Sequence, residues 1–281
     1  MDTEQARTFL AVASAGSFVA ASERLHITQS TVSARIKALE EYLGVSLFVR
    51  SKSGADMTDA GRRFQKHAAM LVRTVEQARH DLGRPEGFRA SIVIGARIGL
   101  WDGLLIDWLA EIRHSMPDVS IRAESGFEAD LMQGLIDGRI DIGVMYTPQR
   151  RPNLELAHLM DEQTVLLSST TCSSNQAEYI EVDWGPEFHA QHKASYPDAG
   201  GPALSVNIGW LGLQYMLRHG GSGYFPHRLA EDYIADGRMI ETAGSPQFVL
   251  PSWLVYQSNR DKSLIDPLID ALRNMLDNRN I

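Results

Sequence analysis

Residues 25–40 read LHITQSTVSARIKALE, a short polar start followed by apolar residues at helical spacing. Thr28 provides a side-chain oxygen that can cap the free backbone amides at the start of a helix. Behind it the apolar residues recur every three or four positions, which predicts that one face is buried. That inward face comprises Val32, Ile36, Leu39 and Leu43, and the outward face comprises Gln29, Ser30, Ser33 and Lys37.

The flanking residues predict a small domain around this helix. Two shorter helices precede it, separated at Gly16-Ser17, and Gly44 ends it. Val45, Leu47, Phe48 and Val49 then lead into the turn-rich residues 51–54, which indicates a β-hairpin or wing with Arg50 and Lys52 at its basic tip. Three helices and a wing are typical of a winged helix-turn-helix, which we expect over residues 1–58.

The outward face of the helix fits the major groove of duplex DNA, where each base pair presents its own pattern of donors, acceptors and methyl groups. Gln29 can pair with adenine through two hydrogen bonds, Ser30 and Ser33 are adaptable donors, and Arg35 or Lys37 can reach guanine or phosphate. An ordinary solvated helix has a similar face. The cap, the turn, the wing and the local charge together favour DNA binding. The DNA-contacting set is Thr28, Gln29, Ser30, Ser33, Arg35, Lys37, Arg50 and Lys52.

Charge is divided unevenly along the chain, whose formal net charge is -8. Residues 1–90 hold 13 Lys and Arg against 10 Asp and Glu, whereas residues 91–281 hold 14 against 25. Only the N-terminal segment therefore suits a polyanion.

A long helix is predicted over residues 59–83, because Thr58-Asp59 is a favourable helix start and an apolar stripe follows. The stripe either packs on its own domain or pairs with a second copy of the chain. We favour a dimer seam, because a helix between two domains has little neighbouring surface to cover it. Residues 84–90 then form a hinge. The seam residues are Phe64, Ala68, Leu71, Val75, Ala78 and Leu82.

Beyond the hinge, strand and helix patterns alternate, which predicts βαβ units and a parallel sheet with helices on both faces. The pattern occurs twice, which suits two similar lobes. We expect one lobe over residues 91–160 and 258–281, the other over residues 161–257, and a small-molecule site in the cleft between them.

Several stretches resemble LysR-type transcriptional regulators in the same order and spacing. They are residues 25–40 quoted above, FLAV at 9–12, AGSF at 15–18, LGVSLFVR at 43–50, TDAG at 58–61 and GLIDGRIDIG at 134–143. Two shorter matches, WGPEF at 184–188 and LW at 100–101, are similar to the HdfR-like subgroup.

The resemblance implies a winged helix-turn-helix, a dimerising linker helix and a two-lobed effector domain like the periplasmic binding proteins, assembled as a dimer or tetramer. It places an effector near Arg97, Ile98, Gly99, Leu100 and Trp101, with Ser168 and Ser169 on the facing lobe. Family members often have Ser or Thr in the first of these loops to hold a carboxylate, and this chain has none between Ala96 and Trp101. Arg97 then either binds an anion at a helix start or forms an exposed surface pair.

Other functional classes are less favoured. Solvated side chains explain His189 and His192 better than a metal site, and Cys172 has no partner cysteine in the sequence, so we expect neither metal nor cofactor. No nucleophile elbow or phosphate loop suggests an enzyme. The acidic start and the lack of a long apolar run predict a cytoplasmic protein that does not enter the membrane. A solute-binding protein is the alternative. As a regulator, the chain would meet double-stranded DNA, an effector, itself and RNA polymerase.

Overall fold

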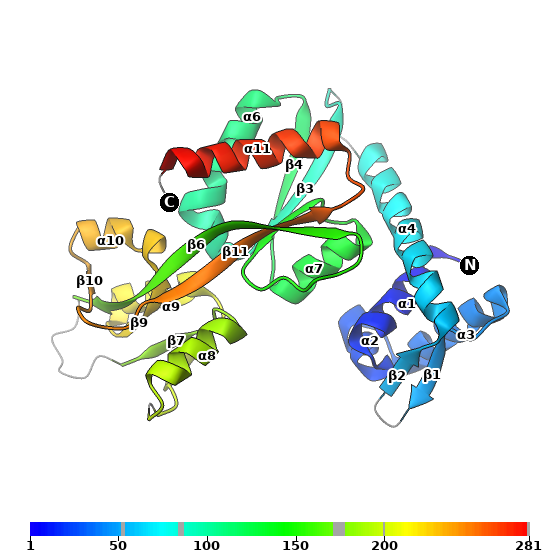
Figure 1. Cartoon of the computed structure of the whole chain (residues 1–281), viewed down its shortest axis with the longest axis horizontal. Coiled ribbons are helices and arrows are strands. Elements are labelled where there is room, and N and C mark those ends of the chain that lie inside the picture. Colours follow the sequence, from blue (N-terminus) through cyan, green and yellow to red (C-terminus); the bar gives the residue numbers. More distant parts are fainter. Residues whose placement is uncertain (52–53, 84–86, 171–177, 199, 280–281) are drawn as a thin grey trace. The chain divides into compact units, whose positions relative to one another are not determined.

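The computed structural model describes residues 1–51, 54–83, 87–170, 178–198 and 200–279. They form two compact units (Figure 1). The first contains Met1–Ser91 and Ile136–Ile140, and the second contains Ile92–Leu135 and the chain from Asp141 onward. In this described part of the chain, no helix combines the length and hydropathy needed to cross a membrane.

The first unit contains the three short helices, the hairpin and the long helix that the sequence predicts. Side chains cap the helices: Asp2 and Gln5 bond reciprocally at the first, and Ser17 accepts backbone bonds at the second. Gly16 and Gly44 end the first and third helices in the left-handed conformation that glycine adopts readily. The elements are α1 (Thr3–Ala15), α2 (Phe18–Leu25), α3 (Gln29–Leu43), β1 (Phe48–Ser51), β2 (Gly54–Met57) and α4 (Asp59–Leu82).

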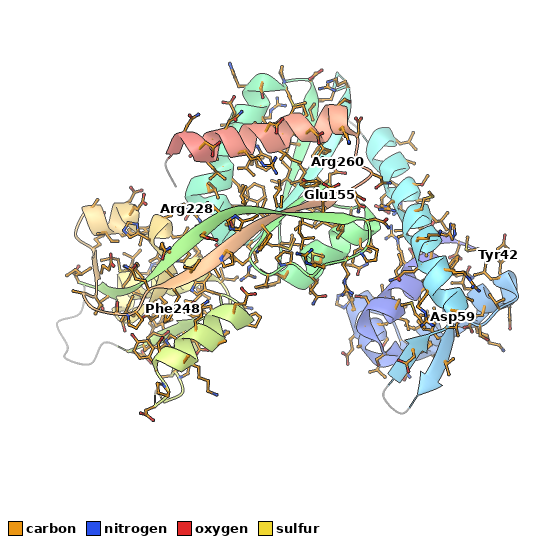
Figure 2. The ribbon with its side chains drawn as sticks, in the orientation of Figure 1. Tyr42, Asp59, Glu155, Arg228, Phe248 and Arg260 are labelled. Atoms are coloured by element: carbon orange, nitrogen blue, oxygen red, sulfur yellow. The ribbon has the colours of Figure 1, made fainter. Side chains whose placement is uncertain are left out.

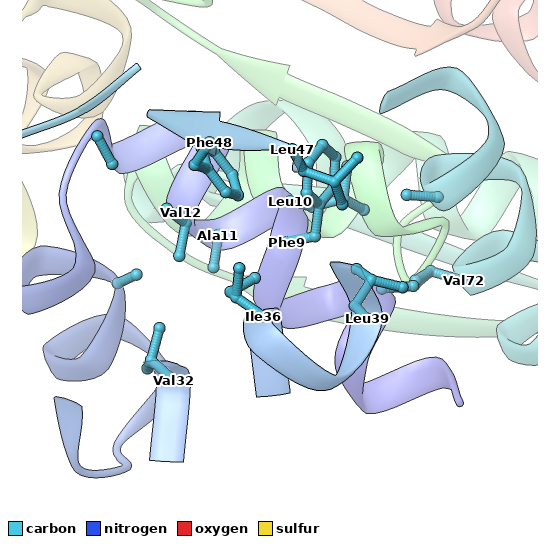
Figure 3. Packing of buried hydrophobic residues seen from close by; sticks show 14 residues of the cluster. Phe9, Leu10, Ala11, Val12, Val32, Ile36, Leu39, Leu47, Phe48 and Val72 are labelled. Atoms are coloured by element: carbon cyan, nitrogen blue, oxygen red, sulfur yellow. The ribbon is translucent and has the colours of Figure 1, made fainter. Parts of the chain in front are cut away.

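An apolar core joins these elements (Figure 3). The Phe9 ring of α1 lies 5.2 Å from the Phe48 ring and 5.1 Å from the Phe64 ring. Val32, Ile36 and Leu39 of α3 are fully or almost fully buried in this core. Their burial confirms the inward face predicted from the spacing, and it fixes the opposite face of α3 outward.

The hairpin is anchored on the turn between α1 and α2. The Ala55 amide donates to the Gly16 carbonyl over 2.8 Å, and Gly54 has a φ of +138°. A β-carbon at Gly54 would collide with that carbonyl, so this close approach requires glycine. The predicted wing is thus part of the same unit as α3.

The second unit has two lobes. Lobe I contains the chain after the expected hinge and the C-terminal helix. Its elements are β3 (Ala90–Ala96), α5 (Ile98–Leu100), the kinked segment η1 (Trp101–Leu105), α6 (Ile106–Ser115), β4 (Val119–Ser125), α7 (Glu128–Asp137), β5 (Ile142–Met145) and α11 (Lys262–Arg279).

Lobe II contains the part of the chain that lies between two long strands, β6 (Leu154–Ser169) and β11 (Phe248–Gln257). A separate parallel pair, β7 with β8, lies in this lobe. Its remaining elements are β7 (Ile180–Val182), α8 (Pro186–Ser195), β8 (Leu204–Val206), α9 (Gly209–His219), β9 (Ser222–Pro226), η2 (His227–Leu229), α10 (Glu231–Ala235) and β10 (Met239–Glu241).

The main sheet is mixed, which corrects the prediction of a parallel sheet. Its order is β10-β6-β11-β5-β3-β4, with β9 paired to β6. β3 and β5 are parallel, but β11 runs antiparallel to both β5 and β6. β6 and β11 extend side by side through both lobes (Figure 1), so the boundary expected at residue 160 falls inside a strand. Local periodicity cannot reveal strand direction, because both directions have the same two-residue repeat.

Candidate functional site

The start of α3 holds the outward polar residues. Thr28 caps the helix, its Oγ1 accepting from the Thr31 amide over 3.2 Å, and the Ser30 and Thr31 hydroxyls each lie 2.8 Å from the same oxygen. Gln29 and Ser30 are exposed in the first turn, and Lys37 is exposed farther along, 3.7 Å from Glu41. The structure therefore leaves Gln29, Ser30 and Lys37 open to solvent, while Thr28 is already engaged in capping.

Two other predicted DNA contacts are less accessible. Ser33 is half-buried and lines a small cavity with Phe18 and Phe48. Arg35 turns toward α1, where its Nη1 lies 3.2 Å from Glu4 Oε2 and donates to Thr8 Oγ1 over 3.3 Å. The Arg35 guanidinium is thus paired within its own domain, and its contact with DNA stays a prediction. The reason for this pairing is its place beside the buried face, three residues after Val32.

The wing residues are described only in part. Arg50 pairs with Ala55 in the antiparallel hairpin through its backbone. Lys52 lies outside the described residues. The phosphate contacts expected of both side chains stay predictions.

The apolar stripe of α4 divides into two halves. Ala68 is fully buried in the N-terminal core, and Phe64 and Leu71 pack against that core. Toward the other end, Ala78 is exposed, Val75 is half-buried and Leu82 is 88% exposed. Ala68 is therefore covered by its own domain, which corrects its assignment to a dimer seam, and the seam role of the half-buried Phe64 and Leu71 stays a prediction.

In the second unit, Arg97 is buried at the end of β3, with 6% exposure. Its Nε lies 3.4 Å from Glu128 Oε1, and its guanidinium lies 4.8 Å from the centre of the Phe127 ring. It also donates to the Asp183 carbonyl over 3.4 Å. The expectation of an exposed surface pair is therefore wrong, because the side chain is buried and paired with Glu128, whereas anion binding by Arg97 stays a prediction.

A cavity of about 430 Å³ lies between the lobes. Its apolar walls include Trp210, which is 53% exposed, and Ile106, which is 56% exposed. The Trp101 indole faces this cavity, and its Nε1 donates to the Glu124 carbonyl over 3.2 Å. Lobe I contributes Ile98, Gly99, Trp101, Asp102 and Ile106, and lobe II contributes Trp210, Leu213 and Leu229.

The cavity gathers only part of the predicted effector set. Ile98, Gly99 and Trp101 line it, whereas Leu100 is fully buried beneath them. Ser168 and Ser169 pair with β10, and Ser168 Oγ lies 3.2 Å from Thr242 Oγ1. These two serines are not among the residues that line this cavity, and their contact with an effector stays a prediction. The cause is the length of β6, whose last residues extend into lobe II past the cavity.

Arg228 connects the two lobes beside this cavity (Figure 2). From η2 of lobe II, its Nη2 donates to the Gly99 carbonyl over 2.8 Å and its Nη1 to the Asp102 carbonyl. Its Nε donates to Glu162 Oε1 over 2.7 Å, and both side chains of this pair are at most 10% exposed. The loop for which the sequence analysis raised anion binding therefore already accepts hydrogen bonds from the guanidinium of Arg228.

Tyr146 completes this charged group. Its hydroxyl donates to Glu162 Oε2 over 2.7 Å. Burial, and next the Glu162 carboxylate, raise the pKa of Tyr146 well above its usual value, so the hydroxyl keeps its proton. Sequence analysis missed all three residues. One signal existed, because Glu162 occupies an inward position of β6 between the buried Met160 and Thr164. No local sequence pattern indicated a role for Arg228.

Histidines of lobe II also differ from expectation. The His192 ring stacks on the Tyr179 ring, with centroids 5.4 Å apart, rather than being solvated. His189 Nε2 lies 3.0 Å from Asp183 Oδ1. In the described residues no group of three His, Cys, Asp or Glu side chains could hold a metal ion.

Comparison with known proteins places both units in one family. Residues 3–62 match the bacterial regulatory helix-turn-helix protein model of the lysR family, and residues 85–183 match the LysR substrate binding domain model. The two models together cover more than half of the chain.

Relatives and solved structures agree with these matches. The chain is 27% identical to the HTH-type transcriptional regulator HdfR of Yersinia enterocolitica, over 94% of both chains. It is similar in fold to ArgP from Mycobacterium tuberculosis, with a TM-score of 0.58 and 22% identity over 98% of this chain and 97% of that chain. It is also similar to full-length CbnR in complex with its target DNA, with a TM-score of 0.50 and 21% identity over 98% and 99% of the chains.

Proposed function

Because the chain belongs to the LysR family of transcriptional regulators, we propose that Gln29, Ser30 and Lys37 of α3 contact its operator and that a small effector binds between the two lobes. The observation that supports the DNA contact is the arrangement of α3. Its apolar side is buried on Phe9 and its neighbours, while Gln29 and Ser30 stand exposed at the capped start of the helix. A helix N-terminus with short polar side chains is the part that other helix-turn-helix proteins insert into the major groove.

The DNA contact is tested with genomic fragments that the purified chain retains, compared with unrelated DNA of equal length. We expect Gln29→Ala to weaken specific binding by about 1–3 kcal/mol, the value of one bidentate base contact, and to leave non-specific binding unchanged. Non-specific binding rests on phosphate charge and should fall steeply as salt rises.

A matched control is Gln65→Ala on α4, which makes the same chemical change away from α3. Gel-shift titrations of both variants at two salt concentrations measure the effect. An equal loss on specific and random DNA for Gln29→Ala would remove Gln29 from the base-reading set. A chain that retained no genomic fragment would instead support the solute-binding alternative.

For the effector we propose a molecule with an apolar body, held between Trp101 and Trp210. The support is the lining of the cavity, where indole and aliphatic side chains predominate. The two nearby arginines already have carboxylate partners, Arg97 with Glu128 and Arg228 with Glu162. A ligand carboxylate would have to displace one of those pairs, at a desolvation cost of several kcal/mol.

Trp210 provides the readout for this site. Trp210→Phe should remove most of the emission change that an added effector causes, because Trp210 is the exposed indole of the cavity. Trp253→Phe, on β11 outside the cavity lining, is the control. A full response in the Trp210→Phe variant would place the effector elsewhere.

Effector binding would act on DNA through the oligomer. We propose that the exposed end of α4, with Val75, Ala78 and Leu82, contributes to self-association into a dimer or tetramer. A ligand that binds differently to open and closed lobes shifts their populations, and such a shift would alter the spacing of two recognition helices on DNA. Contact with RNA polymerase and a cytoplasmic location belong to the same proposal.

A further inference from the structure

A second cavity, of about 620 Å³, lies entirely within lobe II. It opens between β7, α8 and residues 200–203, with Leu166 of β6 and Tyr224 of β9 among its lining residues. It shares no lining residue with the cavity between the lobes. Any ligand it holds would therefore occupy a site separate from the interlobe site.

One wall of this cavity is aromatic. The Tyr179 and His192 rings are stacked, 13° from parallel, and the Tyr196 ring lies 5.0 Å from the His192 ring. The Tyr224 ring meets His192 edge-on at 5.5 Å. Behind this wall, Phe188 and Phe248 pack against both His192 and Tyr224 (Phe248 is labelled in Figure 2). The rings are thus held in place by a packed second layer.

The polar atoms of the wall are engaged with one another. Tyr196 and Tyr224 hydroxyls lie 2.8 Å apart, and Tyr224 donates to the Pro246 carbonyl over 3.0 Å. The Tyr179 hydroxyl lies 3.0 Å from His192 Nε2. Burial raises the pKa of Tyr179 and of Tyr224 and lowers the pKa of His192, so all three groups are uncharged at neutral pH. The wall offers neutral ring faces, which attract cations.

Two carboxylates, Glu178 and Glu181, join this neutral wall, and Lys193 is the lysine in the lining. The Glu181 side chain is 29% exposed, and its pairing with His189 is long, 4.0 Å from Nδ1, because the other ring nitrogen of His189 lies 3.0 Å from Asp183. Lys193 is exposed on α8. A partly desolvated carboxylate beside ring faces has the charge and the surface that suit an organic cation.

We propose that this lobe II cavity binds a small organic cation, an ammonium group on an apolar or aromatic body, with the ammonium beside Glu181 and the body against the rings of Tyr179 and Tyr196. The cavity has room for a molecule of that size. Binding here would give the effector domain a second input, independent of the cavity between the lobes.

Three probes of nearly equal shape test the proposal by isothermal titration calorimetry on the full chain: phenethylamine, phenethyl alcohol and phenylacetate. We expect the amine to bind about tenfold more tightly than the alcohol, because cation–ring and carboxylate attractions act only on the amine. Phenylacetate should bind most weakly, since Glu178 and Glu181 repel it.

Variants locate the bound amine. Glu181→Gln should remove most of the preference for the amine over the alcohol, whereas Glu187→Gln, on the exposed side of α8, should leave it unchanged. Tyr179→Phe should retain binding, because the ring face remains, and Tyr179→Leu should weaken it. Ile106→Asp, in the interlobe cavity, should not affect the amine, so this proposal and the interlobe effector proposal can fail separately.

Three results would overturn the proposal. One is equal affinity for amine and alcohol, another is an unchanged preference in Glu181→Gln, and the last is no heat from phenethylamine at millimolar concentration. Thermal melting of each variant checks that the loss of binding is not a loss of folding.

Discussion

The outward face of α3 and the cleft between the effector lobes are built in opposite ways. The α3 face lies within one helical segment, its polar side chains are exposed, and the apolar core lies on the other side of the helix. The cleft brings Glu162 and Arg228 of lobe II to the Gly99 and Asp102 carbonyls of lobe I, and the Glu162 and Arg228 side chains are buried.

On the α3 face, the side chains proposed to contact DNA are not those that stabilise the fold. At the cleft, the charged side chains beside the proposed effector site also stabilise the fold. An exposed side chain such as Gln29 can change without opening a cavity or leaving a charge unpaired. The charges of Arg228 and Glu162 are paired away from water. Replacing either residue therefore also lowers the free energy of unfolding. Residues on the α3 face can therefore change without a loss of stability, whereas the residues that connect the two lobes cannot.

The largest effect is expected at the cleft. Glu162→Ala leaves the buried Arg228 guanidinium without its carboxylate, and we expect a loss of about 3–5 kcal/mol in the free energy of unfolding. All five tryptophans lie at or after Trp101, so tryptophan emission during urea unfolding reports the effector unit alone.

Two controls sharpen this prediction. Asp236→Asn breaks an exposed pair with Arg238 in the same lobe, and its urea midpoint should match that of the parent chain. A double replacement, Glu162→Leu with Arg228→Met, should recover part of the loss, because it removes the unpaired buried charge but also takes these partners from the Tyr146 hydroxyl and the Gly99 and Asp102 carbonyls. If Glu162→Ala had the same urea midpoint as the parent chain, the predicted contribution of the Glu162–Arg228 pair to stability would be refuted.

A somewhat smaller effect is expected in the N-terminal core. Phe64→Ala removes a half-buried ring that lies 5.1 Å from the Phe9 ring, which should cost about 3 kcal/mol. Far-ultraviolet circular dichroism measures it, in the part of the unfolding transition that tryptophan emission does not follow.

Leu82→Glu on the same helix provides the contrast. Leu82 is almost fully exposed, so this change should leave folding intact and weaken self-association, which analytical ultracentrifugation measures. If Phe64→Ala dissociated the oligomer without destabilising the chain, Phe64 would belong to the seam after all.

The smallest effect is expected at the cap of α3. Thr28→Ala removes the oxygen that accepts from the Thr31 amide, and we expect a loss of about 1 kcal/mol. Thr28→Ser keeps that oxygen and should unfold like the parent. A DNA-binding defect in Thr28→Ala that Thr28→Ser restores would arise from the helix start rather than from a base contact. No stability change in Thr28→Ala would show that the cap is dispensable and would leave Thr28 free for DNA.

The sequence predicted the first unit well because its decisive contacts are local. Val32, Ile36 and Leu39 share a helix face through the 3.6-residue repeat alone, and Thr28 caps the amide three residues ahead. The two-lobed architecture was also predicted, from the alternation of strands and helices together with the family resemblance. The contacts of Arg35 within the domain were not predicted, because its partners, Glu4 and Thr8, belong to another helix.

Local sequence patterns could not predict which residues meet in the cleft between the lobes. Periodicity marks Ile98 and Trp101 as apolar, but it cannot bring Trp210 to face them or place Arg228 on the carbonyls of Gly99 and Asp102. Those contacts depend on how β6 and β11 pair across both lobes, and strand pairing joins residues about 90 positions apart. The sequence by itself thus determined which face of α3 is buried and which is exposed, and the tertiary structure decided which side chains line the cavity between the lobes.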